Sequence, residues 1–194
     1  MFGAVLDANV LVPSLLRDVL LTLGAGGMYQ PLWSPVILDE TERAIRMLRR
    51  ERKLDGDDTD RYISRLLSEM QKNFPDASTT GWEHLEGTFG LPDADDEHVA
   101  ALAMHAHAGV IVTDNLRDFP EHKLPGELHA LSGTEFLNTT IDTNPAHAAV
   151  ELDAMARRRE STLGDLLGVM TLQFGSVLSV DLLKPYADAA ARSE

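Results

Sequence analysis

The sequence predicts an α/β protein with a central, mostly parallel sheet and a helical C-terminal extension. Two apolar runs, residues 2–6 and residues 109–113, have the composition of buried strands, and each is followed directly by acidic residues. Helical patterns separate the two runs, and a strand–helix–strand connection of this kind normally joins parallel strands. From about residue 140 onward only helical patterns follow. The length of 194 residues suits one good-sized domain with an appendage.

The other elements of the sheet region are predicted from capping residues and apolar periodicity. Ser34 and Pro35 are a strong helix start, because serine caps a helix and proline fits its first turn. The predicted elements are a helix from about residue 15, a strand at 29–33, a helix at 36–53, a helix capped by Asp57 or Asp58 and ending near residue 73, an irregular stretch at 75–90 with at most a short strand, a helix capped by Asp93, a strand at 127–131 and a short helix at 132–137.

The C-terminal extension is expected to hold three helices and no site. The first two are capped by Asn144 and Thr162, and the third begins near Val177 and is broken or kinked at Pro185. This part contains no predicted strand and no acidic cluster, so packing or partner binding is a better expectation for it than chemistry.

The composition excludes several kinds of site and of partner. The chain has no cysteine, which rules out disulfides, thiolate zinc sites and cysteine nucleophiles and leaves oxygen or histidine ligands. Its formal net charge of −14 argues against a passive nucleic-acid binder. The same charge is compatible with a nuclease whose acids bind cations, and with a basic protein partner. No apolar run reaches the length of about 18 residues needed to cross a bilayer. The N-terminus lacks the pattern of a signal peptide, so we expect a cytoplasmic protein without membrane association.

Asp7 follows the first predicted strand directly. Open α/β sheets bind ligands beyond the carboxyl ends of their strands, where this carboxylate would meet a metal ion or a phosphate. It would equally serve as the cap of the helix that follows. The residue alone does not separate the two interpretations.

Glu40 is the better site candidate on the helix that Pro35 begins. With about 100° per residue, Ile37 and Thr41 lie on the buried face of this helix and Glu40 lies on its flank. A carboxylate that leans toward a core is costly unless a partner compensates it.

Basic residues follow on the outer side of the same helix. Six of the 17 basic residues of the chain lie there, against Glu51 as the only acid in that span: Arg43, Arg46, Arg49, Arg50, Arg52 and Lys53. The commoner interpretation is a solvated helix face. The alternative is a phosphate-binding patch beside the site, with Arg43, Arg46 and Arg50 as the candidate residues.

Two further acidic clusters lie at element ends. The first opens a helix with four acids in five residues, which are Asp93, Asp95, Asp96 and Glu97. Acids are favourable in a first helical turn, but four exceed what capping needs. Asp95 and Asp96 both flank the apolar stripe of this helix, and periodicity does not choose between them. Three histidines, His98, His105 and His107, fall off the stripe or on its edge and are interpreted as surface residues. The second cluster follows the strand at 109–113 and contains Asp114, Asn115 and Asp118.

Carboxylates that converge from these four places would repel one another unless cations bind between them. Oxygen ligands without cysteine select Mg²⁺ or Mn²⁺. Such ions bind a phosphodiester and activate water, so the pattern predicts phosphodiester hydrolysis.

Four short motifs in this order resemble the PIN-domain family, and within it the VapC-type toxins of bacterial toxin–antitoxin pairs. The motifs are Leu-Asp-Ala-Asn-Val-Leu at 6–11, Ser34-Pro35 with Glu40, Pro-Asp-Ala-Asp-Asp at 92–96 before Val-Ala-Ala, and Val-Thr-Asp-Asn at 112–115 with Asp118-Phe119. The resemblance covers residues 1 to about 138. It implies a PIN-like, three-layer α/β/α nuclease domain at 1–138 with a helical extension at 139–194. It also implies a Mg²⁺- or Mn²⁺-dependent endoribonuclease, an RNA substrate, a cognate antitoxin protein as inhibitor, and a homodimer.

The resemblance also assigns roles by position. Asp7, Glu40 and Asp96 match the first three acids of the family. The fourth place is ambiguous, and Asp118 is preferred over Asp114, with Asn115 at a position where the family carries an acid or asparagine. The catalytic set is therefore Asp7, Glu40, Asp96 and Asp118, and the metal ligands are Asp7, Asp96, Asp118 and Asp114. Asn9, Thr113 and Asn115 would orient these acids by hydrogen bonds.

Two other interpretations compete with a nuclease. A haloacid-dehalogenase-like phosphatase would need a second aspartate at position 9, where this chain has Asn9. A catalytically inactive PIN-fold scaffold that binds a protein partner is the alternative from a different class. The complete acid set argues against this scaffold, because uncompensated acids gathered in one place serve no purpose in a dead site.

Overall fold

The computed structural model describes residues 2–175 and 178–191, which form two compact units. The first unit comprises residues 2–14 and 30–132 and contains the sheet. The second comprises residues 15–29 and the described residues from 133 onward, and it is helical. The expected division between residues 138 and 139 falls within a helix of the second unit and stays a prediction.

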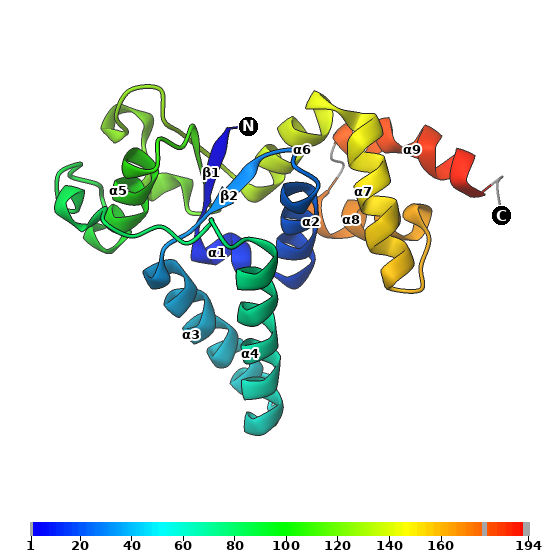
Figure 1. Ribbon diagram of the computed structural model, residues 1–194, viewed down its shortest axis with the longest axis horizontal. Helices are drawn as coiled ribbons and strands as arrows, with labels where there is room; N and C mark the ends of the chain where they lie inside the picture. Colours follow the sequence, from blue (N-terminus) through cyan, green and yellow to red (C-terminus); the bar gives the residue numbers. More distant parts are fainter. Residues whose placement is uncertain (1, 176–177, 192–194) are drawn as a thin grey trace. The chain divides into compact units, whose positions relative to one another are not determined.

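The sheet of the first unit has four parallel strands in the order β2-β1-β3-β4 (Figure 1). The strands are β1 (Gly3–Leu6), β2 (Gln30–Leu32), β3 (Val110–Val112) and β4 (His129–Leu131). β1 and β3 are the central strands, and residues 4–6 and 110–112 are buried, as expected for strands covered on both faces. The predicted α/β fold with a parallel sheet flanked by helices is therefore confirmed.

The register of the two central strands places the first site residues together. Leu6 of β1 pairs with Val112 of β3 in the parallel ladder. The next residues, Asp7 and Thr113, therefore lie at the same edge of the sheet. The backbone N–H of Asp7 donates to the carbonyl of Val112 at 3.0 Å, which extends the ladder to this edge.

The helices of the first unit begin at polar caps. Asp7 caps the short helix α1 (Ala8–Leu11), and Ser34 caps α3 (Pro35–Glu51) by accepting from the N–H of Ile37. Asp55 caps α4 (Gly56–Asn73), so the prediction of Asp57 or Asp58 as cap is wrong. Helix α4 begins at Gly56, earlier than predicted. Asp57 and Asp58 therefore fall in its first turn, where the helix dipole favours them.

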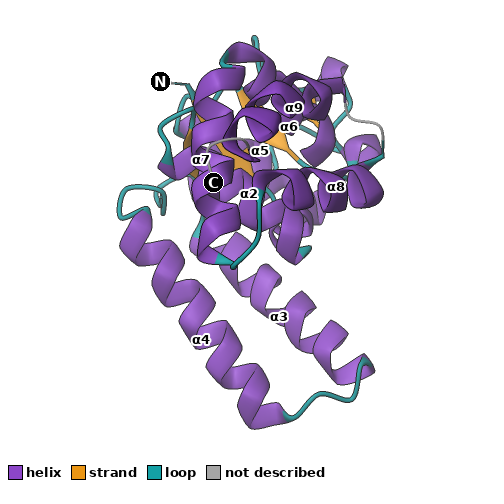
Figure 2. Cartoon of the chain, turned by 90° about the vertical axis from the view of Figure 1, so that its right-hand side faces the viewer, coloured by secondary structure: helices purple, strands orange, loops and turns teal. Residues whose placement is uncertain are grey.

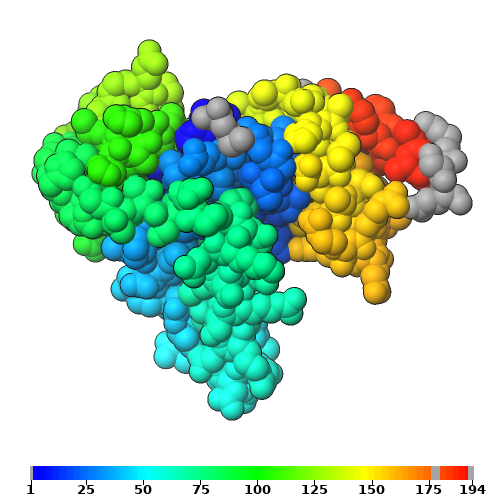
Figure 3. All heavy atoms as spheres, viewed as in Figure 1, coloured from blue at the N-terminus to red at the C-terminus, as the bar shows by residue number. Residues whose placement is uncertain are grey.

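Helices α3 and α4 run side by side and project from the sheet (Figure 2), and the light-blue to teal atoms in Figure 3 belong to this part of the chain. Helix α5 (Glu97–His105) packs instead on the central strands β1 and β3. The stretch between α4 and α5 is irregular, as predicted. Its strand-like contact is one parallel bridge between Trp33 and Ser78, and it also contains the 3₁₀ turn η1 (Glu83–Leu85). Two further 3₁₀ turns, η2 (Ala94–Asp96) and η3 (Leu116–Asp118), carry acidic residues, and η4 (Glu121–Lys123) precedes β4.

The second unit joins one helix from the early part of the chain to four from its end. They are α2 (Ser14–Ala25), α6 (Gly133–Thr143), α7 (Pro145–Arg158), α8 (Leu163–Phe174) and α9 (Leu178–Ala191). Tyr29, which follows α2, packs edge-to-face on Phe136 at 4.8 Å between ring centroids. The imidazole of His147 on α7 contacts the carbonyl of Gly26 at 2.7 Å. These contacts tie the α2 segment to the C-terminal helices.

The predicted caps Asn144 and Thr162 are confirmed. The helix predicted at 132–137 is longer and reaches Thr143. The predicted start near Val177 lies outside the described residues, and α9 continues through Pro185 without a break. Among the helices of the described ranges, none combines the length and apolarity that crossing a membrane requires.

Candidate metal centre

Asp7 lies at the junction of β1 and α1 and is only 5% exposed. Its Oδ1 accepts from the N–H of Ala8 at 2.6 Å, which is the helix-capping contact. Its Oδ2 accepts from Asn9 Nδ2 at 2.6 Å and from Thr113 Oγ1 at 2.7 Å. A carboxylate offers about four acceptor positions, so three hydrogen bonds leave room for a cation. Capping and a role in a site are therefore compatible in this residue.

The electrostatics of Asp7 favour a bound cation. Burial raises the pKa of Asp7 above its usual value, and the nearby charge of Glu40 raises it further. The hydrogen bonds from Thr113 and Ala8 act in the opposite direction without cancelling the effect of burial. The negative charge at this position is thus held at a cost that a cation would relieve.

Thr113 and Asn9 connect the chain segments that follow β1 and β3. The Thr113 hydroxyl donates to Asp7 and accepts from Asn9 Nδ2 at 2.8 Å and from the N–H of Asn115 at 3.1 Å. One donor and two acceptors are all that a hydroxyl has, so its hydrogen-bonding capacity is used fully. Asn9 Oδ1 accepts from the N–H of Asp114 at 2.9 Å. The buried network therefore fixes the position of the Asp7 carboxylate.

A second group of acids lies at the 3₁₀ turns η2 and η3. Oxygen atoms of Asp93, Asp96 and Asp118 all lie within 4.8 Å of one another, an arrangement that could hold a metal ion. Asp93 also caps η2 by accepting from the N–H of Asp95 at 3.0 Å, as predicted. Asn115 Nδ2 lies 3.4 Å from Asp96 Oδ2 and donates to Asp118 Oδ2. Asn115 is thus the amide that bridges two of the three acids.

The charges of this group and of Asp7 act on one another. Burial and the neighbouring charges of Asp7, Asp93 and Asp118 raise the pKa of Asp96 to about 6. Asp7 therefore belongs electrostatically to the same centre as the acids on the two turns. The donor set is carboxylate oxygen throughout, which fits a hard divalent cation such as Mg²⁺ or Mn²⁺.

The structure separates the four neighbouring acids at 93–97 into different roles. Asp93 and Asp96 join the group, whereas Asp95 is exposed and lies outside it. Glu97 is buried and accepts from the N–H of Leu91 at 2.7 Å and from the N–H of Phe89 at 3.0 Å. Glu97 therefore orders the loop that leads into η2. The sequence carries no signal that distinguishes Glu97 from a ligand, and Asp93 was predicted as a helix cap within the acidic cluster but not as a metal ligand.

The second cluster divides in a similar way. Asp118 belongs to the acidic group, and Asp114 is exposed and lies outside it. The guanidinium Nε of Arg117 lies 3.2 Å from Asn115 Oδ1 and 3.4 Å from Asp118 Oδ2. Of the predicted metal ligands, the structure therefore brings Asp96 and Asp118 into the group of three, with Asp7 beside them and Asp114 apart. Their metal-binding and catalytic roles stay predictions.

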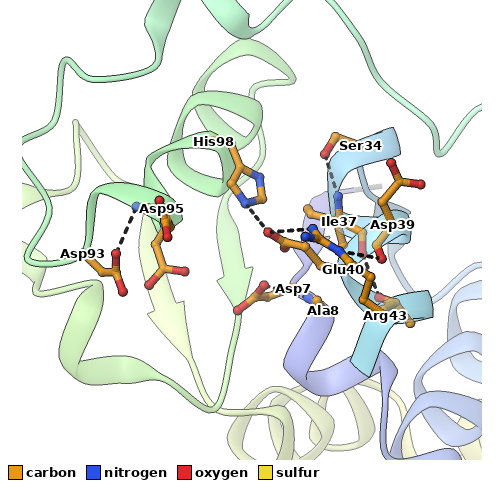
Figure 4. A network of polar contacts seen from close by, with 12 residues as sticks. Asp7, Ala8, Ser34, Ile37, Asp39, Glu40, Arg43, Asp93, Asp95 and His98 are labelled. Carbon is orange, nitrogen blue, oxygen red and sulfur yellow. Dashed lines mark hydrogen bonds and ion pairs between the residues drawn. The ribbon is translucent and has the colours of Figure 1, made fainter. Parts of the chain in front are cut away.

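Glu40 approaches the centre from α3, and its side chain is 31% exposed. Its carboxylate lies near that of Asp7 and below the imidazole of His98 (Figure 4). His98 Nε2 is 3.4 Å from Glu40 Oε1, and Arg43 approaches the same oxygen at 4.0 Å. Burial lowers the pKa of His98, but the hydrogen bond and charge of Glu40, together with the charge of Asp7, outweigh burial and raise it.

The interpretation of His98 as a surface residue is wrong, since this residue is only 4% exposed. Helix α5 is short and packs on the strands and on η1, so every residue from 97 to 103 is buried, including those off the apolar stripe. His105 and His107 are exposed, as predicted.

The arginines of α3 divide into two sets. Arg46 pairs with Glu42 at 2.8 Å and with Asp60 of α4, and Arg49 donates to Thr59 at 3.0 Å. These two residues hold α4 against α3. Arg43, Arg46, Met47 and Arg50 are exposed and line a shallow surface hollow.

The parallel sheet, with acidic residues at the carboxyl edge of its strands, defines an α/β protein whose clustered acids could hold a metal ion. The family model described as "PIN domain" matches residues 3–117, more than half of the chain. The chain therefore belongs to the PIN-domain family, which has a nuclease fold. Comparisons with curated proteins and with solved structures gave no match.

Proposed function

We propose that this protein is a metal-dependent endoribonuclease that hydrolyses RNA phosphodiester bonds, and that it acts in the cytoplasm as the toxin of a type II toxin–antitoxin pair. The observation that carries the proposal is the convergence of Asp93, Asp96 and Asp118 beside the buried Asp7 in a PIN domain. A protein-binding scaffold without activity would have no use for such mutually repelling charges.

The residues present fit a divalent cation. Asp96 and Asp118, with Asp7 and Asp93 beside them, would hold Mg²⁺ or Mn²⁺ through carboxylate oxygens. A bound ion would supply charge neutralisation at the phosphate and activation of water. The protein's own groups hold the acids in place, since Asn9 and Thr113 fix Asp7 and Asn115 bridges Asp96 and Asp118. Glu40 extends the site toward α3, where Arg43 approaches its carboxylate at 4.0 Å.

The exposed residues of α3 are the proposed contact for the RNA backbone. Arg43 and Arg50 lie two helical turns apart, with the exposed Met47 between them. Arg46, the third predicted RNA-binding residue, is held by Glu42 and Asp60 and contributes less. Removing two phosphate contacts from a single-stranded substrate reduces the salt dependence of log K by about 1.4. We expect this change for Arg43→Ala with Arg50→Ala, measured by RNA binding in EDTA, and no change for Arg61→Ala, an exposed arginine of α4.

The proposed partners follow from charge and family. A net charge of −14 suits a small antitoxin whose binding segment is basic. We also propose a homodimer. Co-expression with basic candidate proteins, followed by size-exclusion chromatography with light scattering, measures both associations.

The decisive experiment compares neighbouring aspartates. The purified protein is incubated with structured RNAs in Mg²⁺, in Mn²⁺ and in EDTA, as wild type, Asp96→Asn and Asp95→Asn. Asp96 lies in the acidic group and Asp95 outside it, so cleavage should require metal, be lost in Asp96→Asn and persist in Asp95→Asn. The melting temperature is also measured with and without metal, because an ion that binds only the folded protein raises it. Wild-type protein that neither cuts nor gains stability with metal would favour the inactive scaffold.

A further inference from the structure

His98 is a buried histidine whose polar contact in the structure is with Glu40. Its Nε2 lies 3.4 Å from Glu40 Oε1 across the space between α5 and α3 (Figure 4). Its Nδ1 is buried and has no hydrogen-bond partner among the described residues. The ring packs beside Trp82 at 5.9 Å between ring centroids and an interplanar angle of 46°. Packing and one polar contact therefore define the orientation of the imidazole.

The stability of the fold alone does not account for a histidine at this position. Burying an imidazole with an unpartnered nitrogen costs free energy, and an apolar side chain of similar size would avoid this cost. Buried polar groups that break local packing rules tend to serve a functional site. The polar contact of His98, Glu40, faces the acidic centre.

Glu40 has little else to keep it in place. Its side chain is 31% exposed, and its repulsion from Asp7 favours rotamers that turn away from the centre. Among the described residues its other ion-pair contact is Arg43 at 4.0 Å, and Arg43 is 71% exposed, so solvent weakens this interaction. His98 sits on α5 two residues after Asp96, and α5 packs on the central strands. His98 therefore offers Glu40 a contact whose position is fixed by the packing of α5.

We propose that His98 is a positioning residue that donates from Nε2 to Glu40 and holds this carboxylate toward Asp7. It thereby links α3 to the segment that carries Asp96, so that the separate acids form one metal centre. This inference rests on the proposed function in so far as it requires the centre to bind a divalent cation. It assigns His98 no contact with metal or RNA.

The test replaces His98 by leucine and by glutamine. Glutamine keeps an N–H donor at a reach similar to that of Nε2, whereas leucine fills the space without a donor. Mn²⁺ affinity is measured by calorimetry, and the melting temperature is measured in EDTA. His98→Leu should bind Mn²⁺ about 10-fold more weakly, because residues that orient metal ligands typically contribute this much. Its melting temperature in EDTA should equal or exceed that of the wild type. His98→Gln should bind Mn²⁺ much as the wild type does.

His105→Leu is the matched control, because it removes an exposed histidine from the same helix, and it should change neither quantity. Wild-type Mn²⁺ affinity in His98→Leu would overturn the inference and leave the proposed function standing. Equal losses of affinity in both variants, with lower melting temperatures in EDTA, would show that His98 serves packing and would also overturn it. A wild-type protein that binds no Mn²⁺ would instead refute the proposed metal centre, and the inference with it.

Discussion

The candidate centre has two halves that the protein holds very differently. Asp7 follows the end of the central strand β1, is buried, and accepts three hydrogen bonds of 2.6 to 2.7 Å. Asp93, Asp96 and Asp118 lie in or next to short 3₁₀ turns. Asp93 is exposed, and Asp96 and Asp118 are half-buried. Asn115 contacts two of them.

The difference indicates a fixed half and an adaptable half. The hydrogen-bond donors around Asp7 all come from the protein itself. The acids on the turns repel one another. Burial raises the pKa of Asp96, and the neighbouring charges of Asp7, Asp93 and Asp118 raise it further. A cation would therefore order the second half more than the first. Four substitutions can break or sharpen this comparison.

The largest effect is expected for Asp7→Asn, which removes charge from the fixed half. Metal-dependent RNA cleavage should fall by about 100-fold or more, since even residues that only orient a ligand contribute 10- to 100-fold. Circular dichroism should show an intact fold, because an asparagine oxygen can still cap α1. Cleavage at the wild-type rate by this variant would exclude Asp7 from the site.

Thr113→Val tests the hydrogen bonds rather than the charge. Valine has nearly the shape of threonine but leaves Asp7, Asn9 and the N–H of Asn115 each without one partner. The free energy of unfolding should fall by about 1–3 kcal/mol, because these groups are buried or half-buried. Urea denaturation in EDTA measures this change. An unchanged midpoint would mean that the network does not stabilise the fixed half.

Asn115→Ala makes the corresponding change in the adaptable half. It removes the amide that bridges Asp96 and Asp118, and both acids keep access to solvent. Mn²⁺ affinity should fall by about 10-fold, the lower end of the range for such contacts. The free energy of unfolding in EDTA should change much less than in Thr113→Val. An equal loss of stability in the two variants would contradict the division into two halves.

The smallest effect concerns the pH dependence of the metal-free protein. The pKa of Asp96 is raised from 3.8 to about 6 in the folded state. Between these values the folded protein binds more protons at this group than the unfolded chain does, so ionisation of Asp96 lowers stability as the pH rises through about 6. In EDTA, Asp96→Asn should therefore melt at a higher temperature than the wild type above this pH, and the difference should vanish at low pH. A difference that does not vary with pH would show that the pKa of Asp96 is not raised in the folded protein.

Local signals in the sequence predicted several strands and helix caps. The apolar runs before Asp7 and Asp114 are strands, and Ser34, Asp93, Asn144 and Thr162 are caps, because these features depend on a few adjacent residues. The cap of α4 was misplaced, since three aspartates near that turn are chemically alike and local chemistry does not rank them.

The sequence by itself determined the parallel sheet and the gathering of acids at its carboxyl edge, because strand polarity and strand ends are encoded locally. Only the tertiary structure decided which acids form the centre. Asp95, Asp96 and Glu97 are consecutive, and their roles differ because η2 ends and α5 begins between them. Asp95 is exposed, Asp96 joins Asp118, and Glu97, the first residue of α5, accepts from the N–H groups of Phe89 and Leu91. His98 became a partner of Glu40 because α5 is enclosed by neighbours distant in sequence. In the same way, α2 joined the C-terminal helices through Tyr29 and Gly26. Such pairings arise from long-range packing, on which periodicity within one segment carries no information.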